Sequence, residues 1–93
     1  MKTELDNEIL QAAIESFGVQ SQLDMAIEEC AELIDALMKH RRGRNDIQAV
    51  VTEIADVQIM MAQLEIIFAG NSKIVEMERM RKMDRLRNRL GKS

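Results

Sequence analysis

Residues 45–70 read NDIQAVVTEIADVQIMMAQLEIIFAG, and this stretch decides the fold. Asn45 or Asp46 is a good helix cap, and Gly70 favours the left-handed backbone with which many helices end. Between these residues, apolar side chains fall on nearly every side of the helix that their spacing predicts. Helices of this kind lie at the centre of a fold and are largely buried. The stretch therefore predicts an all-α protein built around one central helix.

Three further helices follow from apolar side chains at helical spacing and from breaks at glycine or short polar residues. The four predicted helices cover residues 4–16, 21–42, about 46–69 and about 72–90. Ser21 caps the second helix, and Asn71 or Ser72 caps the fourth. The short link Gly43-Arg44-Asn45 suits an antiparallel arrangement of the second and third helices. We therefore expect a four-helix chain.

The length of the chain limits how much surface one copy buries. Residues 1–93 are one domain's worth of sequence, and a lone domain of this size buries only roughly 60 to 70% of its unfolded surface. A helix that is apolar nearly all round would then leave a large apolar face in water. We expect the helical bundle to be completed by oligomerisation, as a homodimer or homotetramer.

Composition excludes several classes of protein. No apolar run approaches the roughly 20 residues of a membrane span, and the sequence opens without the pattern of a secretory signal. A single cysteine cannot form an internal disulfide. With no Trp or Tyr and only two Phe, the chain lacks the stacking surfaces of single-strand binders. We expect a cytoplasmic protein that binds neither membranes nor nucleic acid.

Charge is divided unevenly along the chain. Residues 1–70 hold 5 Lys and Arg against 13 Asp and Glu, a net charge of −8, whereas residues 71–93 hold 8 against 3, or +5. An acidic body suits a cation, and a basic end suits an anion. The alternative is an acidic body with a basic helical tail that binds no ligand.

Acids replace apolar residues on two helix faces. The second helix has an ordinary core face of apolar residues at three- and four-residue spacing, namely Leu23, Ile27, Cys30, Ile34 and Leu37. A second line on that helix contains Glu29 and Glu32 among apolar residues, and a similar line on the third helix contains Glu53 and Asp56. Residues three apart lie on neighbouring turns, so each pair shares one face of its helix. In an antiparallel hairpin the four carboxylates can converge.

Four carboxylates in a partly buried place repel one another and are costly to desolvate unless something pairs with them. A divalent cation resolves both problems. Because the set offers only oxygen, without His or Cys, it suits Mg²⁺, or Mn²⁺ in its place, rather than zinc. The alternative is a pair of solvated acidic faces. We predict a Mg²⁺ site made of Glu29, Glu32, Glu53 and Asp56.

These acids also resemble the motif of a known family. Residues 28–33, EECAEL, and residues 53–57, EIADV, match the EExxE…ExxD signature of the MazG-like all-α nucleoside-triphosphate pyrophosphohydrolases. The resemblance spans about residues 14–90. It implies Mg²⁺-dependent hydrolysis of an NTP or dNTP to the monophosphate and pyrophosphate, in nucleotide-pool house-cleaning. It further implies metal binding by the four acids and a homodimer or homotetramer.

Further residues complete the predicted site. Glu28 lies about 100° round the helix from Glu29, so we predict a catalytic role in which it orients the attacking water; the alternative is a plain surface acid. Lys82, helped by Arg79 or Arg85, is the predicted contact for the triphosphate. The alternative for these cations is a solvated basic face.

Two other functions stay open. A phosphoribosyl-ATP pyrophosphohydrolase is a similar helical hydrolase, but its usual aromatic-histidine pair is absent, since Gln58-Ile59-Met60 follows Val57. A non-enzymatic helical assembly or regulatory module would pack its apolar faces on a partner and leave the acids in water. The base of the nucleotide is not predicted, and we expect Phe17 and Phe68 to pack in the core rather than stack on it.

Overall fold

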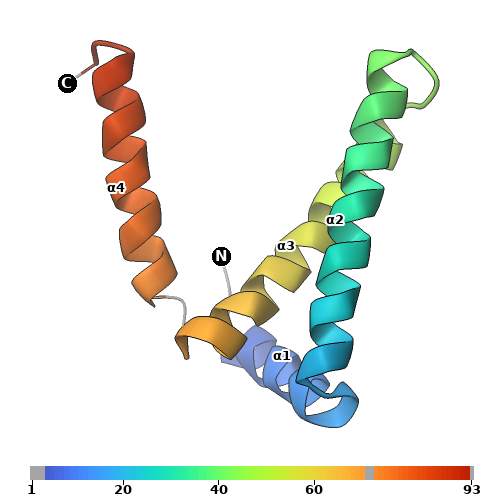
Figure 1. Cartoon of the computed structure of the whole chain (residues 1–93), viewed down its shortest axis with the longest axis vertical. Helices are drawn as coiled ribbons and strands as arrows, with labels where there is room; N and C mark the ends of the chain where they lie inside the picture. Colours follow the sequence, from blue (N-terminus) through green and yellow to red (C-terminus); the bar gives the residue numbers. More distant parts are fainter. Residues whose placement is uncertain (1–3, 71–72, 93) are drawn as a thin grey trace.

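The computed structural model describes residues 4–70 and 73–92, and all regular secondary structure in these ranges is α-helical (Figure 1). The helices are α1 (Glu4–Phe17), α2 (Val19–Arg41), α3 (Ile47–Ala69) and α4 (Lys73–Arg89). The predicted all-α chain of four helices is confirmed over the described residues. Within the same ranges, no helix has both the length and the apolar character needed to cross a membrane.

The two ends of α3 form as the sequence predicts. The side chain of Asp46 accepts a hydrogen bond from the backbone N–H of Ala49 at 3.0 Å, which satisfies one of the free donors of the first turn. Gly70 adopts a φ of 74°, and its N–H donates to the carbonyl of Ile66. The predicted caps of the fourth helix, Asn71 and Ser72, lie outside the described residues.

The start of α2 differs from the prediction. α2 begins at Val19, directly after Gly18, so Ser21 lies inside the first turn and does not cap the helix. Gly18 has a φ of 90°, which glycine adopts readily, and its N–H donates to the carbonyl of Ile14 at 2.9 Å. Its carbonyl accepts from the N–H of Gln22 at 3.1 Å. A single glycine therefore closes α1 and opens α2, and no separate cap is needed.

Helices α2 and α3 form an antiparallel hairpin, which is the main tertiary contact of the chain (Figure 1). At the tip of the hairpin, Nδ2 of Asn45 donates to the carbonyl of Ala36 at 2.9 Å and ties the link to α2. At the open end, α1 packs against both helices. Over the described residues, the helix packed closest to α4 is α3, and Figure 1 shows α4 standing away from the hairpin.

The buried core is small, because one contact between two helices covers only one face of each. The buried apolar residues are Leu10, Ile14, Ala26, Ala36, Met60 and Ala62. Two polar side chains, Gln22 and Gln63, are buried with them, at 5% and 4% exposure.

The predicted core face of α2 is not buried within a single chain, so that prediction is wrong for one copy. Ile27, Ile34 and Leu37 are 70%, 62% and 45% exposed, and Leu23 and Cys30 are only half-buried. The neighbouring face, which carries two alanines, is the buried one. Small side chains let the axes of two packed helices come close, so this face makes the tighter contact.

The outer surface of α3 is exposed as well, although the sequence predicts a helix buried nearly all round. Ile47, Val51 and Ile54 are 69%, 46% and 42% exposed. Phe17 and Phe68, which were expected in the core, are 66% and 73% exposed. Within one chain, nothing in the described ranges covers these side chains. Soluble monomers seldom leave contiguous apolar surface of this kind in water.

Candidate metal centre

Three acids of the hairpin meet between α2 and α3. Glu29 comes from the middle of α2, and Glu53 and Asp56 come from successive turns in the first half of α3. One carboxylate oxygen of each lies within 4.8 Å of the other two, and all three residues are half-buried. They converge because residues three apart share a face of α3, and the hairpin turns that face toward α2. Three of the four predicted ligands are therefore brought together.

Glu32, the fourth predicted ligand, lies at the edge of this group. It is exposed, and it is not one of the three acids whose oxygens come together. Its charge nevertheless helps to raise the pKa of both Glu29 and Glu53. The structure therefore places Glu32 beside the trio of acids rather than within it.

The acids of this group lie close to other negative charges. Partial burial first, and then the charges of neighbouring acids led by Glu32 and Asp56, raises the pKa of Glu29 above its ordinary value. Partial burial, followed by the same two charges, also raises the pKa of Glu53. Oε2 of Glu29 and Oε2 of Glu53 are buried without a hydrogen-bond partner. None of the ion pairs found in the described ranges involves these acids.

This set of donor atoms fits a hard divalent cation. Carboxylate oxygens without His or Cys suit Mg²⁺ or Mn²⁺, and Mg²⁺ in particular binds through a few carboxylates while keeping several waters. The two buried oxygens that lack a hydrogen-bond donor are atoms that such an ion would satisfy. Glu29, Glu53 and Asp56 are the residues that would hold it.

Glu28, the predicted catalytic residue, is exposed and lies outside the trio. Among the charges that raise the pKa of Glu29, its charge has the smallest effect. This position is consistent with a residue that faces water next to the metal centre rather than one that binds the ion. Its role in orienting a water molecule stays a prediction.

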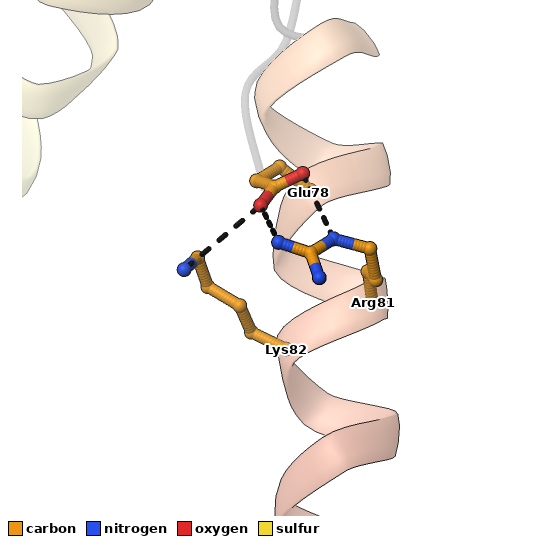
Figure 2. A network of polar contacts seen from close by, with 3 residues as sticks. All are labelled: Glu78, Arg81 and Lys82. Atoms are coloured by element: carbon orange, nitrogen blue, oxygen red, sulfur yellow. Dashed lines mark hydrogen bonds and ion pairs between the residues drawn. The ribbon is translucent and has the colours of Figure 1, made fainter.

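The predicted phosphate contacts on α4 lie away from these acids within one chain. Among the described residues, α4 packs against α3 and not against α2, so Lys82 is not beside Glu29. Figure 2 shows Glu78 between Arg81 and Lys82 on α4. Arg81 donates to both carboxylate oxygens of Glu78, and Nζ of Lys82 lies 3.9 Å from Oε1 of the same carboxylate.

The other two predicted phosphate contacts, Arg79 and Arg85, are also exposed residues of α4. Nη1 of Arg79 lies 3.4 Å from Oε1 of Glu76, one turn earlier in the same helix. Arg85 acts with its neighbours on Glu78, whose pKa is lowered first by hydrogen bonds from Arg81 and then by the surrounding positive charges, against its partial burial. The acids of α4 are therefore balanced by cations of their own helix.

Two glutamines lie on the same faces of α2 and α3 as the acids, and their burial was not predicted from the sequence. Gln22 precedes Glu29 by seven residues and Gln63 follows Asp56 by seven, so each lies two turns, or about 10 Å, along its helix from the acids. Both side chains are buried, and Oε1 of Gln63 has no hydrogen-bond partner. The seven-residue spacing between each glutamine and its acid could have predicted that the glutamines share the face of the acids.

Compared with known proteins, the chain matches no family model, no curated protein and no solved structure. The resemblance to MazG-like hydrolases therefore rests on the acidic motif itself and on the position of its residues in the hairpin.

Proposed function

We propose that the chain is a Mg²⁺-dependent pyrophosphohydrolase of the MazG type, which converts an NTP or dNTP to the nucleoside monophosphate and pyrophosphate. The observation that carries this proposal is the convergence of Glu29, Glu53 and Asp56 within 4.8 Å across the α2–α3 hairpin. Motif residues that are separate in the sequence lie in one partly buried place, and none of the ion pairs in the described part of the chain involves them. We also propose that the functional unit is a homodimer or homotetramer, because the outer faces of α2 and α3 are exposed.

The reaction needs a water molecule to attack one phosphorus of the triphosphate chain while a phosphoanhydride bond breaks. Attack at either the α- or the β-phosphorus yields the same monophosphate and pyrophosphate, and the proton of the water leaves to solvent or to a base. When bound, Mg²⁺ would supply positive charge that offsets the negative charge developing on the triphosphate. Glu29, Glu53 and Asp56 would hold the ion, and Glu32 would support it from the edge. Glu28 orients the attacking water from its exposed position next to Glu29.

In this proposal the basic residues of α4 bind the triphosphate, chiefly through Lys82, with Arg79 and Arg85 in support. Because α4 does not pack against α2 within the described part of one chain, these residues would reach the acids of another copy. The proposed oligomer is therefore a requirement for their role in substrate binding.

The experiment that tests the function is a panel of NTPs, dNTPs and modified nucleotides with Mg²⁺, in which release of pyrophosphate is measured. We expect release from at least one nucleotide, its loss in EDTA, and its recovery with Mg²⁺ or Mn²⁺. Phosphoribosyl-ATP is included in the panel, because release of pyrophosphate from this compound alone would indicate a phosphoribosyl-ATP pyrophosphohydrolase instead. The absence of pyrophosphate release from every compound would refute the proposal.

The exposed apolar faces favour one other function, a non-enzymatic helical assembly module. Such a module needs no metal, so its melting temperature should be the same in EDTA and in Mg²⁺. A hydrolase with a metal centre should melt at a higher temperature when Mg²⁺ is present, because the ion binds the folded state alone.

A further inference from the structure

Apolar side chains follow each helix of the α2–α3 hairpin in a narrow stripe. On α2 they alternate at four- and three-residue spacing, and they are Leu23, Ile27, Cys30, Ile34 and Leu37. On α3 the same spacing holds for Val50, Ile54, Val57 and Met61. At about 100° per residue, the members of each stripe lie within about 80° of one another. All of these side chains are exposed or half-buried within one chain.

The two stripes lie on the same side of the hairpin. The buried contact between the helices includes Ala26 and Ala36 of α2 and Met60 of α3. On each helix the stripe is rotated from that contact by roughly 100° in the same sense. Because the helices are antiparallel (Figure 1), equal rotations bring both stripes to one side, which we call the hairpin face. Glu32 is rotated by about 80° in the opposite sense, so the acids open on the other side of the hairpin.

The spacing of the α2 stripe matches a second copy of itself. Arg41 follows Leu37 by four residues and extends the stripe. From Leu23 to Arg41 the spacing is then 4, 3, 4, 3, 4, which reads the same in both directions. Two such stripes match along their whole length when they pack in antiparallel directions about a twofold axis. In that packing, Ile27 of one copy lies opposite Leu37 of the other.

The charges at the ends of the hairpin face favour the same direction of packing. Asp24 and Arg42 are exposed, and they lie on one flank of α2 because the 18 residues between them complete about five turns. None of the ion pairs in the described ranges involves either residue. In antiparallel packing, Asp24 of each copy meets Arg42 of the other. If the two hairpin tips met instead, Arg41, Arg42 and Arg44 of both copies would lie together and repel.

We infer that the hairpin face is the interface of a twofold homodimer, in which α2 packs antiparallel against α2 of a second copy. The inference rests on the homo-oligomer proposed above, and it names the surface and the direction of packing that form it. The contact covers the exposed Ile27, Ile34 and Leu37 of both copies at once. The acids lie on the other side of the hairpin and α4 takes no part in the interface, so Lys82 stays free for the proposed role in substrate binding.

Thiol crosslinking tests the direction and the register of this packing. All variants carry Cys30→Ser, so that no native thiol reacts. Ile27→Cys/Leu37→Cys should give a covalent dimer with a short bismaleimide, because the two positions lie opposite each other across the interface. Within one helix they are ten residues apart, which is about 15 Å, so they should not link to each other. Each single-cysteine variant should also stay unlinked, because its thiols in the two copies are about 15 Å apart in this packing.

The matched control for the double variant is Met25→Cys/Lys39→Cys in the same Cys30→Ser background. These two exposed positions lie at matching levels in the antiparallel packing, but on the side of α2 that faces away from the interface. The control should therefore run as a single chain on a denaturing gel after the same treatment.

A charge exchange supplies a second measurement that leaves the apolar residues intact. Asp24→Arg alone, or Arg42→Asp alone, should weaken the dimer by about tenfold in Kd, because each twofold dimer contains this contact twice. Asp24→Arg/Arg42→Asp restores opposite charges across the interface, so its Kd should return close to that of the wild type. Light scattering across a dilution series measures Kd, and circular dichroism confirms that each variant is helical.

The outcomes separate this inference from the other proposals. Absence of the link from Ile27→Cys/Leu37→Cys, an equal link from the control, or failure of the double charge variant to recover would overturn the inference. If the wild type is nevertheless an oligomer, the proposed homo-oligomer stands, whereas a monomeric mass would overturn both. Release of pyrophosphate by the wild-type protein decides the hydrolase proposal independently.

Discussion

The α2–α3 hairpin and α4 hold carboxylates of the same kind in opposite electrostatic states. On α4, Glu78 lies between Arg81 and Lys82, and their hydrogen bonds and charges lower its pKa. In the hairpin, burial together with the charges of neighbouring acids raises the pKa of Glu29 and of Glu53. The charge of α4 is balanced within one exposed helix, where ion pairs contribute little to stability. None of the ion pairs in the described ranges involves the three acids of the hairpin, and this is why they are the better candidate for a metal site.

The largest expected effect of this difference is on catalysis. Asp56→Ala should lower kcat for pyrophosphate release by roughly a hundredfold, because a correctly held ion contributes several kcal/mol to stabilising the transition state. The matched control is Glu78→Gln, which removes one acid from α4 and should leave kcat unchanged. Steady-state kinetics at saturating Mg²⁺ with the best nucleotide of the panel measure both. If Asp56→Ala were fully active, the hydrolase proposal would fail.

The next effect is on thermal stability. Mg²⁺ at a concentration roughly 100 times its Kd should raise the melting temperature by about 10 °C or more, because it binds the folded state and relieves repulsion among the acids. Glu53→Gln should reduce that rise, and Glu78→Gln should not. Differential scanning calorimetry of the three proteins, each with EDTA and with Mg²⁺, makes the comparison. Equal melting temperatures of the wild type in the two buffers would contradict the metal centre.

A smaller effect concerns pH in the absence of metal. The raised pKa of Glu53 favours its protonated form in the folded state. The stability that protonated Glu53 contributes to the fold is therefore fully present below the ordinary pKa of 4.5, and it is lost as pH rises through the raised pKa. Glu53→Gln imitates the protonated form. The variant should therefore match the wild type below pH 4.5 and melt a few °C higher at neutral pH.

Glu78 should show the opposite dependence of stability on pH in the same experiment. Because its pKa is lowered, the stability that ionised Glu78 contributes to the fold is present above pH 4.5 and is lost as pH falls through the lowered pKa. Glu78→Gln should therefore be slightly less stable than the wild type at neutral pH and equal to it in acid. Melting curves in EDTA from pH 3 to pH 8 record both variants. Two variants with the same sign of pH dependence would show that the hairpin and α4 do not differ as described.

The smallest effect is on substrate affinity. Lys82→Ala should raise KM for the triphosphate by a few fold while the fold and the response to Mg²⁺ stay the same, because an exposed lysine adds little to stability. Lys92→Ala, beyond the end of α4, is the control for a simple loss of positive charge. A wild-type KM and kcat for Lys82→Ala would mean that the basic face of α4 is only a solvated surface.

The sequence was sufficient to predict the four helices and the convergence of three of the four acids, whereas Glu32 lies beside them. Asp46 and Gly70 carry strong local signals, because a side-chain cap and a left-handed glycine depend on few neighbours. The three-residue spacing of Glu53 and Asp56 fixes their common face in the same local way. These features were predicted because they depend on contacts within one helix or across one short link.

The sequence was not sufficient to predict which faces are buried within one chain. Ile27 and Ile34 fit a core pattern, yet the face with Ala26 and Ala36 is the buried one. An apolar pattern predicts that a helix face is buried, but it does not indicate whether the same chain or another chain buries it. The separation of Lys82 from the acids was missed for a similar reason, because no local signal sets the direction in which α4 leaves α3.

The link at the tip of the hairpin also controls the register between α2 and α3. Asn45 is bonded to the carbonyl of Ala36, and Asp46 caps α3 one residue later, so the two helices are fixed to each other along their length from that end. A slip of one helical turn would move Glu53 and Asp56 past Glu29 by about 5.4 Å, which exceeds the 4.8 Å within which their oxygens now lie. Residues added to or removed from the link between Arg42 and Asp46 would therefore disperse the acids while leaving each helix intact. The spacing of the three acids is set at a distance from them, by the length of a surface loop.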